Sequence, residues 1–318
     1  MEQKKAAFAA VVGRPSAGKS TLVNLLCGSR VAIVSPVPQT TRNAIRGIVN
    51  RDRGQLVLVD TPGMHLSGKK FNRRLSETAV RSAGEADIVL YVLDASRAPG
   101  SEEEAVAAQL ARRNIPNPSD GTVPAFPVLA AINKMDLPAA DYGRTREFLR
   151  RAVPALDDSR CFPVSAEKNE GVETLLSKLY DLAPEGTPFY PEEYYTDQEV
   201  DFRIAEIIRG AALPHLRQEL PHSIYVEVAD REFRGGPEPG GPGRGGQKLW
   251  VRAFIICERE SQKGMIVGRG GTIVKAIGEA SRRELNRIFD WKVELDLRVK
   301  TGKDWRHNDA LLRKLLDR

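Results

Sequence analysis

The segment from Gly13 to Thr21, Gly-Arg-Pro-Ser-Ala-Gly-Lys-Ser-Thr, constrains this chain more than any other part of its sequence. It matches the pattern GxxxxGK[ST], in which glycines let backbone amides come close to phosphate oxygens. Lys19 brings a positive charge to the outer phosphates, and Ser20 offers a hydroxyl to a bound Mg²⁺. The apolar run before the segment and the helical spacing of leucines after it predict a strand, a loop and a helix whose N-terminus faces the phosphates. We expect the nucleotide to contact Gly13, Ser16, Ala17, Gly18, Lys19, Ser20 and Thr21.

Beyond this segment, apolar runs typical of buried strands alternate with helical segments. These runs end at Asp60, Asp94, Asn133 and Ser165. The alternation predicts an α/β domain with a mostly parallel sheet covered on both faces, and Arg51–Gly54 predicts a hairpin that adds one antiparallel strand. Because ligands bind beyond the carboxyl ends of the strands in such sheets, we expect the functional residues there.

Two segments are placed to hold Mg²⁺ and the terminal phosphate. Asp60 ends a strand where a nucleotide-bound Mg²⁺ is held, and Gly63 is placed to offer its amide to the terminal phosphate. The polar segment Ser35–Arg42 is typical of a switch that this phosphate orders, and we prefer Thr41 over Thr40 as the hydroxyl that completes the magnesium shell. The expected metal ligands are Ser20, Thr41 and Asp60, and the expected catalytic residues are Lys19, Thr41 and Gly63.

Asn133, Lys134 and Asp136 follow the fourth apolar strand and favour guanine as the base. A carboxylate at Asp136 accepts hydrogen bonds from N1 and N2 of guanine, whereas adenine has no such pair of donors. Asn133 can bind the base and neighbouring loops, and the methylene stem of Lys134 can lie along the ring. At the end of the fifth strand the backbone of Ser165, Ala166 and Glu167 can reach the guanine carbonyl.

The composition permits a second domain and a polyanionic partner. With 318 residues the chain is long enough for about two domains, and its net charge of +6 suits a nucleic acid without proving one. Three scattered cysteines without a CxxC pair favour a reducing compartment. No apolar run reaches the roughly 18 residues that a membrane span needs. We expect a cytoplasmic protein.

The second half of the chain has a different pattern. The proline-rich stretch 183–197 is typical of a linker between a first domain at 1–182 and a second at 198–318. In the second domain two predicted strands flank Arg234–Gly246, which is almost entirely glycine, proline and charge and which we interpret as a flexible inserted loop. The residues from Arg244 onward include 18 lysines and arginines against 10 aspartates and glutamates. We therefore expect a basic domain with a basic C-terminal tail.

A helix-like segment, the tetrapeptide Gly268-Arg269-Gly270-Gly271 and a longer helix follow one another in this second domain. This order resembles a KH domain, whose GxxG loop clamps the backbone of about four single-stranded nucleotides. Glycines let phosphates approach the main chain, and Arg269 is placed to neutralise them. The expected RNA contacts are Lys263, Ile266, Gly268, Arg269, Gly270, Gly271 and Lys275.

Taken together, the nucleotide motifs resemble the P-loop GTPases. The stretches Pro-Gln-Thr-Thr-Arg and Asp-Thr-Pro-Gly-Met-His, together with the KH-like region, resemble more narrowly the Era family of bacterial ribosome-assembly GTPases over nearly the whole chain. The resemblance implies a P-loop GTPase domain followed by a smaller α+β type II KH domain, with GTP, GDP and Mg²⁺ as ligands. It also implies binding of the 3′ region of small-subunit ribosomal RNA, a role in processing that RNA and in 30S assembly, a monomeric state and peripheral contact with the inner cell membrane.

Two departures from related GTPases bear on hydrolysis. Met64 stands where Ras-like proteins carry the glutamine that orients the attacking water, and a thioether holds water poorly. Ser16 stands where related GTPases carry an asparagine that helps bind K⁺, so K⁺ stimulation is in doubt although a hydroxyl can still coordinate the ion. We expect slow intrinsic hydrolysis, on the order of 10⁻⁴ to 10⁻² per second.

Two other classes of protein compete with this interpretation. One is an RNA-binding or membrane-surface adaptor whose nucleotide domain is only structural, against which the complete loop with Lys19 and Ser20 is the main argument. The other is an ATP-dependent RNA-modifying enzyme, against which Asp136 is the main argument.

Overall fold

The structure is a computed structural model that describes residues 4–35, 37, 40–63, 70–113, 127–154, 156–235, 247–303 and 305–316. It divides into two compact units, Met1–Asp197 and Gln198–Arg318. The elements of the first unit are β1 (Lys5–Val12), α1 (Lys19–Cys27), β2 (Ile45–Arg51), β3 (Gly54–Asp60), α2 (Lys70–Glu85), β4 (Ile88–Asp94), α3 (Ser101–Arg113), β5 (Val128–Asn133), α4 (Tyr142–Ala152), the 3₁₀ turn η1 (Asp158–Arg160), β6 (Cys161–Pro163) and α5 (Val172–Leu182).

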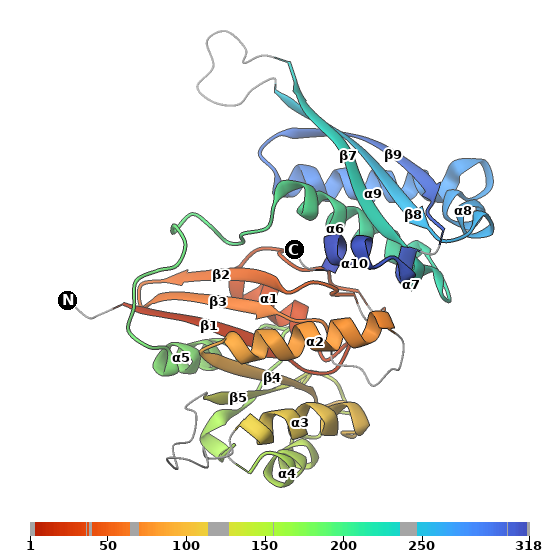
Figure 1. Cartoon of the computed structure of the whole chain (residues 1–318). Helices are drawn as coiled ribbons and strands as arrows, with labels where there is room; N and C mark the ends of the chain where they lie inside the picture. The colour runs from red at the N-terminus through yellow and green to blue at the C-terminus, as the bar shows by residue number, and fades with distance from the viewer. Residues whose placement is uncertain are drawn as a thin grey trace, which may run out of the picture. The chain divides into compact units, whose positions relative to one another are not determined.

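The first unit is built on a six-stranded sheet in the order β2-β3-β1-β4-β5-β6. Only the β2–β3 pair is antiparallel, and the other four neighbouring pairs are parallel. Figure 1 shows α2 in front of the sheet and α1 behind it. The expected mostly parallel sheet with one antiparallel hairpin strand is confirmed.

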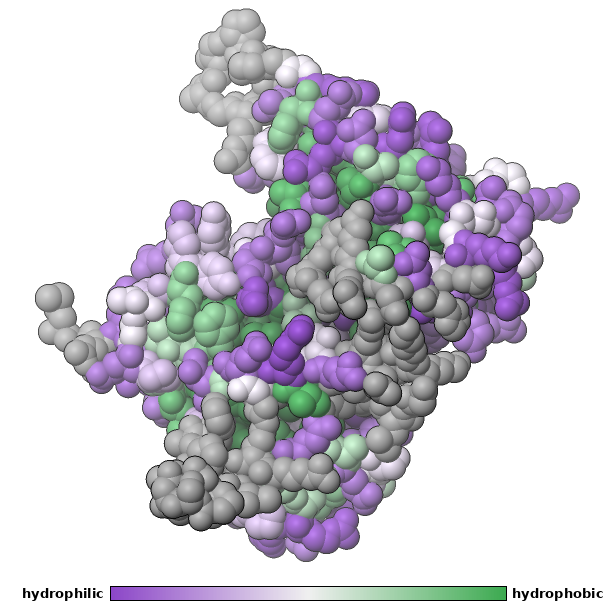
Figure 2. Space-filling model, in the orientation of Figure 1, coloured by the Kyte–Doolittle hydropathy of each residue, from purple (hydrophilic) through white to green (hydrophobic). Residues whose placement is uncertain are grey.

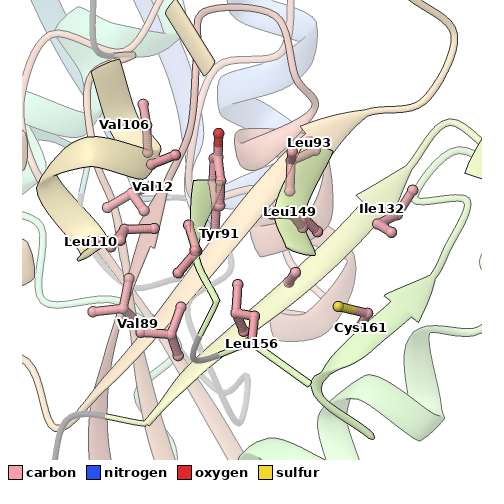
Figure 3. Packing of buried hydrophobic residues seen from close by; sticks show 14 of the residues in the cluster. Val12, Val89, Tyr91, Leu93, Val106, Leu110, Ile132, Leu149, Leu156 and Cys161 are labelled. Carbon is pink, nitrogen blue, oxygen red and sulfur yellow. The ribbon is translucent and has the colours of Figure 1, made fainter. Parts of the chain in front are cut away.

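One core of this unit lies between the central strands and helices α2, α3 and α4, because side chains from these elements form one buried cluster. Tyr91 of β4 lies at its centre among aliphatic side chains, and Figure 3 shows it between Leu110 and Leu149. The Tyr91 hydroxyl is buried and donates to the carbonyl oxygen of Glu103, 3.0 Å away. This bond fixes the first turns of α3 against β4 from inside the core.

The segment 183–197 packs along the first unit on the β2–β3 side of the sheet. Its backbone is held by the side chain of Gln55 in β3, which is fully buried. The Gln55 carbonyl oxygen accepts from the amides of Phe189 and Tyr190 at 2.8 and 2.9 Å, and its amide nitrogen donates to the Tyr190 carbonyl at 2.8 Å. Further along, the amide of Ile48 in β2 donates to the Tyr195 carbonyl at 3.0 Å. The segment is therefore tied to the first unit, and its boundary as a linker stays a prediction.

The second unit contains a three-stranded sheet in the order β7-β8-β9. The β7–β8 pair is antiparallel and the β8–β9 pair is parallel. Its core contains residues of α6, the three strands, α8 and α9. The elements are α6 (Val200–Ala212), η2 (Leu213–His215), α7 (Leu220–Ser223), β7 (Tyr225–Arg234), β8 (Lys248–Cys257), α8 (Glu260–Val267), η3 (Arg269–Gly271), α9 (Thr272–Ile288), β9 (Lys292–Thr301), η4 (Trp305–His307) and α10 (Asp309–Leu316). This is the helix–strand order expected of the KH type.

Three features of the second unit differ from the sequence interpretation or fall outside the structure. Strand β7 runs on to Arg234, the first residue of the segment that the sequence predicts to be an inserted loop, while the glycine-rich residues 236–246 lie outside the described residues. The expected basic tail is folded. Trp305 is buried and donates to the Ser223 carbonyl at 3.0 Å, and Arg306 forms an ion pair with Glu258.

The surface visible in Figure 2 is mostly hydrophilic over the described residues of both units. Within the described parts of the chain, no helix has both the length and the apolar character needed to cross a membrane.

We predict that Gln55→Leu destabilises the first unit by about 2 to 4 kcal/mol, because an apolar side chain leaves the amides of Phe189 and Tyr190 without their acceptor and the Tyr190 carbonyl without its donor. Urea unfolding of the full chain measures the loss, and hydrogen exchange at residues 189 and 190 should become faster.

The matched control is Arg53→Ala. Arg53 pairs with Asp181 at 2.6 Å, but both side chains are largely exposed. Such pairs contribute less than about 1 kcal/mol. An equal decrease in the free energy of unfolding for Gln55→Leu and Arg53→Ala would contradict the role given to Gln55.

Candidate functional site

The loop between β1 and α1 is held so close to its neighbours that glycine is required at two positions. Gly13 has φ of 150°, and a Cβ atom there would meet the Val92 carbonyl oxygen at 2.4 Å. Gly18 has φ of 97°, and a Cβ atom there would meet the amide nitrogen of Asn133 at 2.2 Å. Ser16 also has a positive φ of 60°, in a region that side chains other than asparagine, aspartate and histidine rarely adopt. The loop therefore curls tightly at the N-terminus of α1, as a phosphate site requires.

Lys19 is buried in this loop and bridges its two ends. Its ammonium donates to the carbonyl oxygens of Gly13 and Arg14 at 3.1 and 2.9 Å. Burial lowers the pKa of Lys19 to about 8, and the opposing charge of Asp60 offsets only part of this effect. Among the described residues, the hydrogen-bond acceptors of this buried cation are carbonyl oxygens, so the phosphates of a nucleotide can supply the negative charge that it lacks in direct contact.

The three expected metal ligands meet at the end of β3. The Ser20 hydroxyl donates to the Asp60 carboxylate at 2.7 Å, and the Thr41 hydroxyl donates to the same oxygen at 3.2 Å. Ser20 and Thr41 lie 3.0 Å apart. Asp60 is fully buried, burial raises the pKa of its carboxyl, and its second oxygen has no hydrogen-bond partner among the described residues. One carboxylate and two hydroxyls form the hard oxygen donor set that Mg²⁺ prefers, so these residues fit the ion.

The switch residues line one cavity with the phosphate loop. A cavity of about 410 Å³ is bounded by Ser16, Lys19, Ser20 and Thr21 on one side and by Thr40, Thr41 and Gly63 on the other. Thr41 contacts Asp60, whereas the Thr40 hydroxyl donates to the Val37 carbonyl, so the preference for Thr41 agrees with this geometry. Gly63 lies against the loop, because a Cβ atom there would come within 2.7 Å of the Pro15 nitrogen. Met64 lies outside the described residues.

A second cavity, of about 210 Å³, lies among the residues that the sequence predicts to bind the base. It is lined by Gly18, Thr21, Asn133, Lys134, Asp136, Leu137, Ala166 and Glu167. The buried side chain of Asn133 donates to the Ala17 carbonyl at 2.9 Å and accepts from the Ala166 amide at 3.0 Å. Asn133 thus joins the phosphate loop to the loop after β6.

Of the tripeptide Ser165-Ala166-Glu167, Ala166 and Glu167 line this cavity, and the Ser165 amide donates to the Glu170 carbonyl at 2.9 Å. The buried Ser165 hydroxyl donates to Asp136 at 2.7 Å and orients that carboxylate. The Ala166 amide is already bound to Asn133, and the Ser165 hydroxyl accepts from the Lys168 amide at 3.0 Å. The main contribution of the tripeptide in this structure is to hold Asn133 and Asp136.

The sequence analysis gave no role to two residues in the phosphate and base region, Arg14 and Asp94. Both are buried, and the Arg14 guanidinium donates to the Asp94 carboxylate at 2.5 Å. Asp94 ends β4 as Asp60 ends β3 and Asn133 ends β5. Because ligands bind beyond the carboxyl ends of parallel strands, the position of Asp94 at the end of β4 was a signal in the sequence that pointed to this residue.

The glycine-rich loop of the second unit also lies at a helix N-terminus. Gly268, Gly270 and Gly271 have φ of 74°, 61° and 78°, and Gly271 caps the 17-residue helix α9. At Gly268 a Cβ atom would meet the Ile273 side chain at 2.7 Å. Arg269 and Gly270 are exposed. The loop therefore presents main chain and one arginine to solvent, as a phosphate clamp requires.

The other expected RNA contacts differ in their surroundings. Lys275 is exposed on α9, and Lys263 pairs with Glu260 at 2.9 Å. Ile266 is fully buried in the core of the second unit, so we give it a packing role in place of the expected RNA contact. An open groove of about 590 Å³ lies between α9 and β9, and its basic lining residues are Arg282, Arg283 and Lys292.

These features define a class of protein: a P-loop nucleotide-binding domain of the GTPase type joined to a KH domain. Residues 8–134 match the family model of 50S ribosome-binding GTPases, and residues 219–306 match the KH domain model.

The chain is 44% identical to GTPase Era of Treponema denticola over 305 residues, covering 96% of this chain and 97% of that protein. It is 41% identical to GTPase Era of Borreliella burgdorferi, covering 98% of this chain and 100% of that protein. Two solved Era structures, each 31% identical and covering 98% of both chains, align with TM-scores of 0.83 and 0.81. The first is a variant of Aquifex aeolicus Era bound to GDP and aluminium fluoride, and the second is Era with MgGDPNP and nucleotides 1506–1542 of 16S ribosomal RNA. The chain belongs to the Era family of GTPases.

We predict that Lys19→Met stabilises the nucleotide-free protein at pH 7 by about 1 to 2 kcal/mol while it abolishes nucleotide binding. The folded-state pKa of about 8 lies below the ordinary 10.5, so charged Lys19 opposes folding below pH 8, and this penalty disappears as the pH rises from about 8 to 10.5. The gain from the substitution should shrink over the same range. Denaturant unfolding at a series of pH values measures it.

Lys168→Met provides the control, because Lys168 is exposed and outside the loop. It should change stability little at any pH. A loss of stability in Lys19→Met at pH 7 would contradict the proposed electrostatic penalty.

Proposed function

We propose that this GTPase is a guanine-nucleotide-controlled RNA-binding protein that binds the 3′ region of small-subunit ribosomal RNA and assists its processing and the assembly of the 30S subunit. The observation that carries the proposal is the presence in one chain of a phosphate loop joined by Asn133 to a base cavity and of a glycine clamp at the N-terminus of α9. The solved Era structure that contains both MgGDPNP and 16S ribosomal RNA nucleotides supports this combination.

In the proposed nucleotide site, the loop from Gly13 to Thr21 binds the phosphates, and Asn133, Lys134 and Asp136 bind guanine. The hydrogen bond from Ser165 to Asp136 supports this assignment, because it leaves the carboxylate oriented at the cavity that it lines. Ser20, Thr41 and Asp60 would hold Mg²⁺, which would supply positive charge against the phosphates of the nucleotide.

Hydrolysis is proposed to be slow, with Lys19, Thr41 and Gly63 as the catalytic residues. Lys19 stabilises charge on the outer phosphates, Thr41 senses the terminal phosphate through the metal site, and the Gly63 amide faces that phosphate. Ser16 stands in place of the asparagine that helps bind K⁺ in related GTPases, so K⁺ stimulation is not part of this proposal, although the Ser16 hydroxyl can coordinate the ion.

The nucleotide is proposed to control RNA binding through the switch segments. Thr41 contacts Asp60 and lies four residues before β2, so ordering of Thr41 by the terminal phosphate would restrain the start of that strand. The proposed RNA site is formed by the loop Gly268–Gly271, with Lys263 and Lys275 nearby in sequence. The cytoplasmic location, the monomeric state and the peripheral contact with the cell membrane also stay predictions.

The alternative function is an RNA-binding or membrane-surface adaptor with a structural nucleotide domain. Lys19 argues against it, because a buried ammonium whose acceptors in the described part of the chain are two carbonyl oxygens is a poor structural element.

We predict that Asp136→Asn weakens GTP binding by about 100-fold and favours xanthosine triphosphate, because asparagine loses two charge-assisted acceptor contacts to guanine and gains a donor for the xanthine carbonyl. Competition against a fluorescent GDP analogue measures both affinities.

Glu167→Gln is the matched control, since Glu167 lines the same cavity and loses the same charge. It should keep the preference for GTP. Full GTP preference in Asp136→Asn would contradict the proposed base recognition.

RNA binding is tested by crosslinking the full chain to cellular RNA with GTP or GDP loaded, followed by sequencing. We expect crosslinks at the 3′ end of small-subunit RNA that differ in yield between the two nucleotides. Gly270→Asp should reduce the yield about ten-fold, because a carboxylate repels the phosphates.

The control for this experiment is Gly270→Asn, which has nearly the same shape without the charge. Both side chains tolerate φ of 61°, and a Cβ atom at Gly270 meets nothing within 4 Å. Equal yields with GTP and GDP would remove the basis for nucleotide control, and equal yields for the two variants would contradict the clamp.

A further inference from the structure

A single buried carboxylate, Asp94, connects the base region of the nucleotide site to the phosphate loop. One of its oxygens accepts from the Arg14 guanidinium at 2.5 Å and from the Lys134 ammonium at 2.8 Å. The other accepts from the backbone amide and the hydroxyl of Ser96 at 3.0 and 2.5 Å. Both oxygens are therefore oriented by fixed donors.

The charge of Asp94 is retained in this environment. Burial by itself would raise the pKa of its carboxyl, but the hydrogen bonds from Lys134 and Ser96 outweigh burial and lower the pKa. Arg14 is equally buried and is also paired with Glu103, whose carboxylate lies 2.5 Å from the guanidinium Nε. Asp94 is thus an ionised group that shares its charge between one cation in the phosphate loop and one in the base motif.

Lys134 is the side chain on which this arrangement acts. It lines both the phosphate cavity and the base cavity, so its methylene stem lies along the boundary between them. Its backbone has a φ of 66°, which fixes the direction in which the side chain leaves the chain. A lysine side chain has many accessible rotamers, and an exposed ammonium without a fixed partner would leave this stem free to move. The buried partner at its end holds the stem in one position.

We propose that Asp94 is a positioning residue that fixes the Lys134 side chain as the wall of the base cavity and thereby slows release of the guanine nucleotide. Asp94 does not touch the nucleotide in this proposal. It acts through Lys134, while Arg14 supplies the second charge that keeps the carboxylate buried and ionised. The inference rests on the proposed nucleotide site.

A purely structural role for Asp94 makes a different prediction. If Asp94 only stabilises the fold, any substitution that weakens the Arg14 pair should affect nucleotide release in proportion to the loss of stability. Glu103 provides the matched comparison, because it is as buried as Asp94 and pairs with the same arginine. Its second oxygen accepts from the Gly100 amide at 2.9 Å, and no contact between Glu103 and Lys134 is found among the described residues.

The test measures the dissociation rate of a fluorescent GDP analogue from the full-length protein and its variants. We expect Asp94→Asn to release the analogue about ten-fold faster than the wild type and Glu103→Gln about two-fold faster at most. Unfolding of each nucleotide-free variant in denaturant gives its loss of stability, so the two effects are compared for each substitution.

A double-mutant cycle with Lys134→Met identifies the path of the effect. Methionine keeps an unbranched stem but has no ammonium for Asp94 to hold. If Asp94 acts through Lys134, Asp94→Asn should add less than about two-fold to the dissociation rate of Lys134→Met. Ser96→Ala is a milder variant for the case that Asp94→Asn does not fold. This variant keeps the charge of Asp94 but removes the hydrogen bond from the Ser96 hydroxyl to its carboxylate. It should increase the dissociation rate of the analogue about three-fold.

Some outcomes would overturn the inference. If Asp94→Asn and Glu103→Gln increased the dissociation rate equally, the effect would not be specific to Asp94. If the increases caused by Asp94→Asn and Lys134→Met multiplied fully in the double variant, Asp94 would not act through Lys134. An unchanged dissociation rate in Ser96→Ala together with an unfolded Asp94→Asn would likewise reject it. Failure of the wild-type chain to bind the analogue would instead reject the proposed nucleotide site, so the two failures are distinguishable.

Discussion

The convergence of parallel strand ends is the constraint on which the rest of the first unit depends. Strands β1, β3, β4 and β5 point the same way, so the loops that follow them meet at one edge of the sheet although they are far apart in sequence. Asn133 turns this proximity into a fixed distance, because its one amide group bonds the loop before α1 and the loop after β6. Phosphate and base cavities are consequently held at a constant separation by the sheet and not by either loop alone.

The same edge of the sheet concentrates buried charge. Lys19 and Asp60 are both desolvated, and their pKa values move toward the neutral forms because burial dominates in each case. Asp94 differs, since hydrogen bonds from Lys134 and Ser96 lower the pKa of its carboxyl despite burial. Lys19 and Asp60 lack part of the opposite charge that would neutralise them, and a bound ligand can supply it. Asp94 already has its partners, so it can hold neighbouring side chains in place. This difference in pairing agrees with the roles proposed for these residues. Lys19 and Asp60 are proposed to contact phosphate and metal, and Asp94 is proposed to orient its neighbours.

The two units share one local structure at the sites proposed for two different polyanions. In each, a glycine-rich loop with positive φ angles precedes a helix N-terminus, at Gly18 for α1 and at Gly271 for α9. The first loop is enclosed and carries a buried lysine, which suits a small ligand surrounded on several sides. The second loop exposes Arg269 and opens toward solvent, which suits a long chain that enters and leaves. The two loops therefore differ in the burial of their charged side chains, because Lys19 is buried and Arg269 is exposed.

Much of this organisation was predictable from local pattern. Hydrophobic periodicity predicted the strands and the hairpin, and the spacing of glycines predicted both glycine loops. Both signals are properties of short segments. Pairings between distant residues were not predictable, since nothing near Gln55 in sequence indicates that it holds residues 189 and 190. Ile266 was misjudged for the same reason, because burial depends on what packs over a helix. By itself the sequence determined the class of nucleotide site and the presence of a KH-type loop. Only the tertiary structure decided that Asp94 joins Arg14 to Lys134, because a charge pair across three strands exists only once the sheet has brought their ends together.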